Sequence, residues 1–167
     1  MSKIKTVGIV GTGVIGTGWI IRNLAHNKIV HAYDQNKNLK NYVLKEIKRT
    51  SKSIKKLFGK KIIIKNLKFF NSLEKALSKV DFVQESVLEN YKVKTDLIQK
   101  ISKYVKSNVI ISSSSSGLLP SKIFSKSKNP QRGIIGHPFN PAYLLPAVEI
   151  VPGKKTTKKF LLDANKY

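Results

Sequence analysis

Apolar residues follow two patterns along this chain, short continuous runs and longer stretches in which they recur every three or four positions. The short runs predict buried strands at residues 7–10, 28–33, 67–70, 80–85, 108–111, 133–136 and 147–151. The periodic stretches predict helices at 14–26, at 39–58 and from Tyr91 to about Val105. Because strands and helices alternate, we expect an α/β fold with a doubly wound, mostly parallel sheet.

Three smaller segments complete the pattern. Residues 62–64 are consecutive isoleucines that fit either a short strand or a loop packed on the core. Asn71 or Ser72 is expected to cap a short helix that runs through Leu77. Thr156 or Thr157 is expected to cap a helix that has barely begun when the chain stops.

A glycine motif of the form G-x-G-x-x-G joins the first predicted strand to the first predicted helix. Gly11 would make the tight turn, Gly13 would let the backbone approach a pyrophosphate, and Gly16 would let the helix pack closely. The turn residues Thr12, Val14 and Ile15 lie at the helix N-terminus, whose free N–H groups and dipole favour an anion. A ligand-free structural turn is the alternative, but the flanking strand and helix favour dinucleotide binding.

The second predicted strand ends in a carboxylate, Asp34, which lies 23 positions after Gly11. In dinucleotide-binding turns an acid about 20 residues on accepts hydrogen bonds from the adenosine ribose. Asp34 therefore favours NAD, since a carboxylate would repel the 2′-phosphate of NADP. Lys37 follows closely enough to keep NADP as an alternative.

The surface charge is the unusual feature of the composition. The 167 residues carry a net charge of +23, with 29 lysines against 3 arginines. Nucleic acid, anionic membranes and acidic ligands are the partners that such a charge could favour. The lysines, however, are spread along the whole chain, and arginine, the preferred residue for bidentate phosphate contacts, is scarce. We therefore interpret the charge as codon bias and expect neither a nucleic-acid nor a membrane partner.

The chain contains no cysteine, which excludes disulfides, a thiol nucleophile and a thiolate metal site. We assign no metal site to it. No run of 18 apolar residues occurs, and the N-terminus enters the first predicted strand almost at once, which leaves no room for a signal peptide. These features predict a soluble, cytoplasmic protein.

The candidate chemistry lies after the predicted strands at 108–111 and 133–136. Five serines, Ser112 to Ser116, follow the first, at the strand end where open α/β sheets place ligands. His137 follows the second and precedes a Pro-Phe-Asn-Pro loop, whereas His26 and His31 are expected to be structural. Glu149, an isolated acid in an apolar strand, needs a partner, and a histidine is a natural one.

Four ordered segments of the chain resemble the 3-hydroxyacyl-CoA dehydrogenase family, and within it the carnitine-oxidising members most of all. They are the glycine turn at 11–16, Glu-Ser-Val-Leu-Glu-Asn-Tyr-Lys-Val-Lys at 85–94, Ser-Ser-Ser-Ser-Gly-Leu-Leu-Pro at 113–120, and Gly-His-Pro-Phe-Asn-Pro at 136–141 with its continuation to Glu149. Acyl-CoA members commonly read Ser-Asn-Thr-Ser-Ser and His-Phe-Phe-Asn where this chain has Ser-Ser-Ser-Ser-Gly and His-Pro-Phe-Asn. The related L-gulonate enzymes usually read His-Pro-Val-Asn.

The resemblance implies a role for each matching residue. His137 would be the general base that takes the proton of the substrate 3-hydroxyl, and Glu149 would orient its ring and stabilise its charged form. Ser116 and Asn140 would hold the substrate oxygen and the nicotinamide in line. Contacts on the nicotinamide-ribose side of the cofactor would come from Glu89 and Lys94, and Asp34 would take the adenosine ribose.

The resemblance also implies a Rossmann-type NAD-binding domain at residues 1–152. Residues 153–167 would begin the connection to a second, helical domain, which completes the substrate pocket and the homodimer in the family. The expected reaction is NAD-dependent oxidation of a small 3-hydroxy substrate, with carnitine favoured. A 3-hydroxyacyl-CoA or L-gulonate-type substrate, and an NAD-binding fragment without turnover, are the alternatives.

Overall fold

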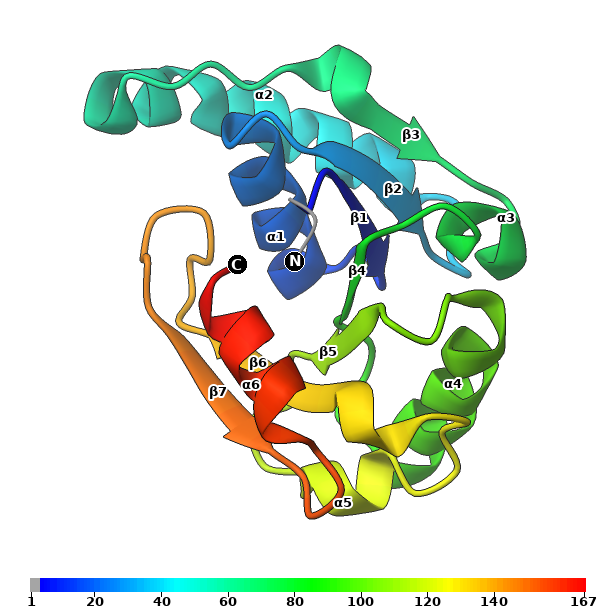
Figure 1. Ribbon diagram of the computed structural model, residues 1–167. Helices are drawn as coiled ribbons and strands as arrows, with labels where there is room; N and C mark the ends of the chain where they lie inside the picture. The colour runs from blue at the N-terminus through cyan, green and yellow to red at the C-terminus, as the bar shows by residue number, and fades with distance from the viewer. Residues whose placement is uncertain (1–3) are drawn as a thin grey trace.

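A single seven-stranded sheet organises the computed structural model, which describes residues 4–167 (Figure 1). Its strand order is β3-β2-β1-β4-β5-β6-β7. All neighbouring strands are parallel except β6 and β7, which are antiparallel. The strands are β1 (Thr6–Val10), β2 (Ile29–Tyr33), β3 (Leu67–Phe69), β4 (Phe82–Glu85), β5 (Ile110–Ser113), β6 (Gly133–Pro138) and β7 (Val148–Pro152). This is the doubly wound, Rossmann-type architecture predicted from the sequence, and its strand order reverses between β1 and β4.

Helices cover both faces of the sheet (Figure 1). They are α1 (Val14–Ala25), α2 (Leu39–Phe58), α3 (Leu73–Leu77), α4 (Tyr91–Tyr104), α5 (Pro120–Ile123) and α6 (Lys158–Asn165), with 3₁₀ turns at Ile64–Asn66 and Pro130–Arg132. One buried core lies under α1, α2 and α6, and a second lies under α3, α4 and α5. The strands β1, β4, β5 and β6 are buried along nearly their whole length, as expected for parallel strands covered on both faces.

Several element ends differ from the sequence prediction. For the three isoleucines at 62–64 the structure has the second of the two alternatives, a loop: Ile62 packs against the core, and only Ile64 enters a regular element, the 3₁₀ turn before β3. Ser72, not Asn71, caps α3 by accepting a hydrogen bond from the Lys75 amide. β6 continues through Pro138, two residues beyond the predicted end, because β7 pairs with it in an antiparallel ladder.

The last helix is longer than predicted and belongs to the packed domain. α6 has eight residues, and Phe160 and Ala164 are buried in the same core as β1. Thr157 occupies the N-cap position without a side-chain bond, and Thr156 donates from Oγ1 to the carbonyl of Gly133 instead. Among residues 4–167, no helix has the length and apolar character needed to cross a membrane.

Candidate cofactor and active site

The turn between β1 and α1 can be built only with glycine at two of its positions. Gly11 has φ of +89°, and a Cβ there would lie 2.7 Å from the carbonyl oxygen of Ser86. A Cβ on Gly16 would lie 1.9 Å from the carbonyl oxygen of Gly11, so α1 starts in direct contact with its own turn. The motif glycines at 11 and 16 are thus required by sterics.

Gly13 differs because a Cβ at this position would meet nothing within 4 Å. It is the N-cap of the 12-residue helix α1, and no side chain caps the first turn of that helix. The open backbone and the free first-turn amides, which include those of Val14 and Ile15, form a concave site that fits a phosphate group. The geometry therefore fits the pyrophosphate of a dinucleotide.

A cavity of about 570 Å³ lies beside this turn. Gly11, Gly13 and Asp34 line it, together with residues of α3 and α4. The Asp34 carboxylate accepts hydrogen bonds from the Thr12 amide at 2.6 Å and from the Asn36 amide at 2.9 Å. These bonds fix the carboxylate at the carboxyl end of β2 and leave lone pairs for a ligand hydroxyl. Lys37, the residue that left NADP as an alternative cofactor, does not line the cavity.

His137 and Glu149 are brought together by the antiparallel ladder of β6 and β7. They are directly opposed in the register, and the imidazole Nδ1 lies 3.9 Å from Glu149 Oε2. The histidine side chain is 30% exposed and the glutamate side chain is 62% exposed, so solvent reaches both groups. An imidazole beside a carboxylate can accept a proton and keep the resulting charge compensated.

The other two histidines are held by the fold. The Nδ1 atom of His31 lies 2.9 Å from the carbonyl oxygen of Ala76, and its ring packs on Phe70 with 4.7 Å between centroids. Burial lowers the pKa of His31. Burial, followed by the nearby Lys60 ammonium, lowers the pKa of His26 at the end of α1. Both residues lie where a structural role was expected.

The loop that follows β5 and begins with Ser114, Ser115 and Ser116, here called the serine loop, is fixed by the carboxylate of Glu89. Its Oε1 accepts hydrogen bonds from the Ser115 hydroxyl at 2.5 Å and from the amides of Ser116 at 3.0 Å and Gly117 at 3.1 Å. Burial raises the pKa of Glu89, but these hydrogen bonds and the Lys94 ammonium outweigh it and hold the pKa below its usual range. The ionised glutamate therefore shapes the loop that carries Ser116.

This arrangement predicts a pH-dependent contribution of Glu89 to stability. Because its folded pKa is lowered, the carboxylate stabilises the fold above the unfolded pKa of about 4.3, and this is lost as the pH falls through the folded pKa. Glu89→Gln should therefore unfold at a lower temperature than the wild type at pH 7, with a smaller difference at pH 3. Thermal unfolding followed by circular dichroism at both pH values tests this, and an unchanged difference would contradict it.

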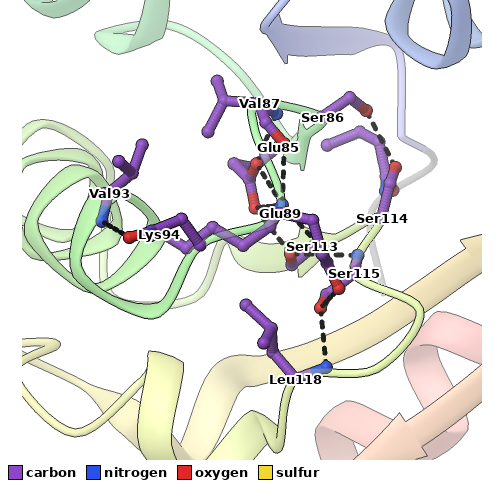
Figure 2. A network of polar contacts seen from close by, with 12 residues as sticks. Glu85, Ser86, Val87, Glu89, Val93, Lys94, Ser113, Ser114, Ser115 and Leu118 are labelled. Carbon is purple, nitrogen blue, oxygen red and sulfur yellow. Dashed lines mark hydrogen bonds and ion pairs between the residues drawn. The ribbon is translucent and has the colours of Figure 1, made fainter.

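Lys94 is buried behind the loop, with only 1% of its side chain exposed (Figure 2). Its Nζ donates to both oxygens of Glu85, at 2.8 and 3.1 Å, and to the carbonyl oxygen of Val87, and lies 3.5 Å from Glu89 Oε2. Glu85 is fully buried and also accepts from the Ser113 hydroxyl at 2.5 Å. Through Glu85 and Ser113, Lys94 thus stabilises the carboxyl ends of β4 and β5 from the interior of the fold.

Sequence reasoning did not single out Glu85. The available signal was an acid at the end of an otherwise apolar strand, which is the argument that singled out Glu149. Its partner Lys94 comes nine positions later, on a different element, so the pair is visible only in the folded chain.

Residues 6–167 match the family model described as the 3-hydroxyacyl-CoA dehydrogenase NAD-binding domain. The chain belongs to this family. It is an NAD-binding domain, as the resemblance predicted.

The comparisons with individual proteins agree with this assignment. L-carnitine dehydrogenase of Oceanobacillus iheyensis is 41% identical over 165 residues, which are 98% of this chain and 54% of that protein. L-carnitine dehydrogenase of Pseudomonas putida is 41% identical over 158 residues, 94% of this chain and 49% of that protein. The chain thus spans about half the length of the curated relatives it matches. The crystal structure of (S)-3-hydroxybutyryl-CoA dehydrogenase from Ralstonia eutropha superposes with a TM-score of 0.86 at 26% identity, covering 98% of this chain and 59% of that one.

The residues that match the family's motifs are distributed over two regions in this NAD-binding domain. Gly11, Gly13 and Asp34 line one cavity, whereas three others lie outside it: Ser116 and Asn140 on the loops after β5 and β6, and His137 near the end of β6. The side chains of Ser116 and Asn140 have no hydrogen-bond partner among residues 4–167, and both residues are exposed. The roles of these residues toward cofactor and substrate remain predictions.

Proposed function

We propose that the protein containing this domain oxidises the 3-hydroxyl of a small hydroxy acid with NAD, and that L-carnitine is its substrate. The observation that carries the chemistry is the His137–Glu149 pair, a partly exposed imidazole opposed by a carboxylate on the edge strand of an NAD-binding sheet. The choice of carnitine is supported by relatives at about 40% identity that are carnitine dehydrogenases.

Each side chain would have a separate task. NAD, when bound, supplies the hydride acceptor. The imidazole of His137 removes the proton from the substrate hydroxyl, and the carboxylate of Glu149 holds the ring and stabilises the imidazolium. Ser116 and Asn140 hold the substrate oxygen, while Glu89 keeps the Ser116 backbone in place through its amide. Lys94 acts indirectly, through the two carboxylates that its ammonium contacts, those of Glu85 and Glu89.

A substrate comparison on the full-length protein tests the proposal. NADH formation would be measured with L-carnitine, with 3-hydroxybutyryl-CoA and with L-gulonate as separate substrates. We expect the highest kcat/KM with L-carnitine. A preference for the CoA thioester or for L-gulonate would change the proposed substrate but not the proposed reaction. NAD binding without turnover of any of the three substrates would show that the protein is a cofactor-binding module.

Cofactor choice gives a second test, which rests on Asp34. Its fixed carboxylate lines the cofactor cavity and Lys37 does not, so NAD should bind at least about tenfold more tightly than NADP, a difference of about 1.4 kcal/mol. Isothermal titration of both reduced cofactors into the 167-residue chain measures the ratio. Asp34→Ala should reduce this preference, and equal affinities in the wild type would remove the assignment of Asp34 to the adenosine ribose.

Three further properties of the whole protein are part of the proposal. We infer a homodimer, a cytoplasmic location and a second, helical domain in addition to the packed unit that contains α6. The family resemblance supports the homodimer and the second domain, and the cytoplasmic location stays a prediction from the sequence. Sedimentation of the full-length protein checks the first of them.

A further inference from the structure

A hydroxyl at the carboxyl edge of the sheet, that of Ser114, is surrounded by three polar side chains. Its Oγ accepts a hydrogen bond from the indole Nε1 of Trp19 at 3.3 Å and from the amide Nε2 of Gln84 at 2.8 Å. It also lies 2.8 Å from the Oγ of Ser86, a contact drawn as a dashed line in Figure 2. None of these four residues has a role in the site described above.

The orientation of the Gln84 amide follows from a second contact. Its Nε2 also lies 3.2 Å from the carbonyl oxygen of Gly136, which can only accept. The nitrogen must therefore face this carbonyl, and its second hydrogen is directed at Ser114. Gln84 is only 1% exposed, so bulk water does not compete for these hydrogens.

The direction of the remaining hydrogen bond can then be obtained by counting. A hydroxyl has two acceptor lone pairs and one proton to donate. Two N–H groups occupy the acceptor sites of Ser114, so its own proton must be donated to Ser86 Oγ. The Ser86 hydroxyl then accepts, and its own proton is free, because residues 4–167 provide Ser86 Oγ with no other partner.

Ser86 lies between the two regions that a bound dinucleotide would span, the glycine turn and the loop that leads to Ser116. It follows β4 directly, is half-buried, and lines the same cavity as Gly11 and Gly13. Ser114, its partner, follows β5 and begins the loop that leads to Ser116. The free proton of Ser86 is therefore located between the phosphate-binding turn and the serine loop.

We propose that Ser86 is a further cofactor-binding residue, which donates a hydrogen bond to a phosphate or ribose oxygen on the nicotinamide half of NAD. Ser114, held by Trp19 and Gln84, is the positioning residue that keeps the Ser86 proton available. The inference rests on the proposed function, since it requires that NAD occupy the cavity beside Gly13. It adds a contact that the glycine turn and the serine loop do not provide.

The test is Ser86→Ala in the 167-residue chain, with affinities measured by isothermal titration. One lost hydrogen bond should weaken NADH and ADP-ribose by roughly 3–15-fold, and AMP, which lacks the nicotinamide half, by less than about twofold. Ser86→Thr keeps the hydroxyl and should retain most of the affinity. Ser112→Ala is the matched control, because Ser112 is a buried neighbouring serine whose Oγ has no partner among the described residues.

The positioning role of Ser114 requires a double-mutant cycle. Ser114→Ala should weaken NADH binding in the wild-type background but not in the Ser86→Ala background, because it acts only through Ser86. Equal effects in both backgrounds would overturn the positioning role.

Other outcomes separate the inference from the proposed function. NADH affinity within twofold of the wild type for Ser86→Ala, or an equal loss of AMP affinity, would overturn the assignment of Ser86 while leaving the proposed function intact. If the wild-type chain bound neither NADH nor ADP-ribose, the proposed function would fail and the inference with it.

Discussion

Replacing His137 with glutamine in the full-length protein is expected to reduce kcat by roughly 10²–10⁴-fold, the usual contribution of a positioned general base. Glutamine can still donate a hydrogen bond but cannot take the hydroxyl proton. His137 does not line the cofactor cavity, so the affinity for NADH should change by less than about twofold. Steady-state oxidation of L-carnitine and a separate NADH titration measure the two quantities.

The controls for this experiment come from the same chain. His26→Gln should leave kcat unchanged, because His26 lies after α1, away from the carboxyl ends of the strands. Glu149→Gln should lower kcat less than His137→Gln does, because the carboxylate orients the ring and compensates its charge without taking the proton itself. Near-normal turnover by His137→Gln would show that the base is another residue.

The largest effect on stability is expected at Lys94. Lys94→Met would leave the fully buried carboxylate of Glu85 without its cation, and breaking a buried pair on one side costs about 3–5 kcal/mol. We therefore expect the free energy of unfolding to fall by about this amount. Urea denaturation followed by the fluorescence of Trp19, the only tryptophan, measures it.

Lys92→Met is the matched control because it changes the same residue type on the same helix. The Lys92 side chain is 87% exposed and pairs with Asp96, an arrangement that contributes little to stability. The double variant Glu85→Gln with Lys94→Met removes both charges and should recover part of the loss. A small effect of Lys94→Met alone would show that Glu85 tolerates burial without a cation.

The sequence by itself determined the fold class and the cofactor turn. Strand and helix periods are local properties of the chain, so the alternation of elements could be predicted without knowledge of tertiary contacts. The glycine motif was equally clear, because its steric demands arise between residues close together in the sequence. They are the positive φ of Gly11 and the contact between Gly16 and the Gly11 carbonyl. The continuation of β6 could not be predicted, since it depends on its pairing with β7.

Tertiary structure decided which polar groups meet. His137 opposes Glu149 because of the β6–β7 register, an arrangement that a histidine and an acid twelve positions apart only suggest. Lys94 matched a motif implied to contact the cofactor, yet its ammonium is bonded to buried Glu85. The Ser86–Ser114 contact joins residues 28 positions apart that directly follow the neighbouring strands β4 and β5. Hydrogen-bond partners of this kind depend on strand order and register, which long-range packing sets and local sequence patterns do not encode.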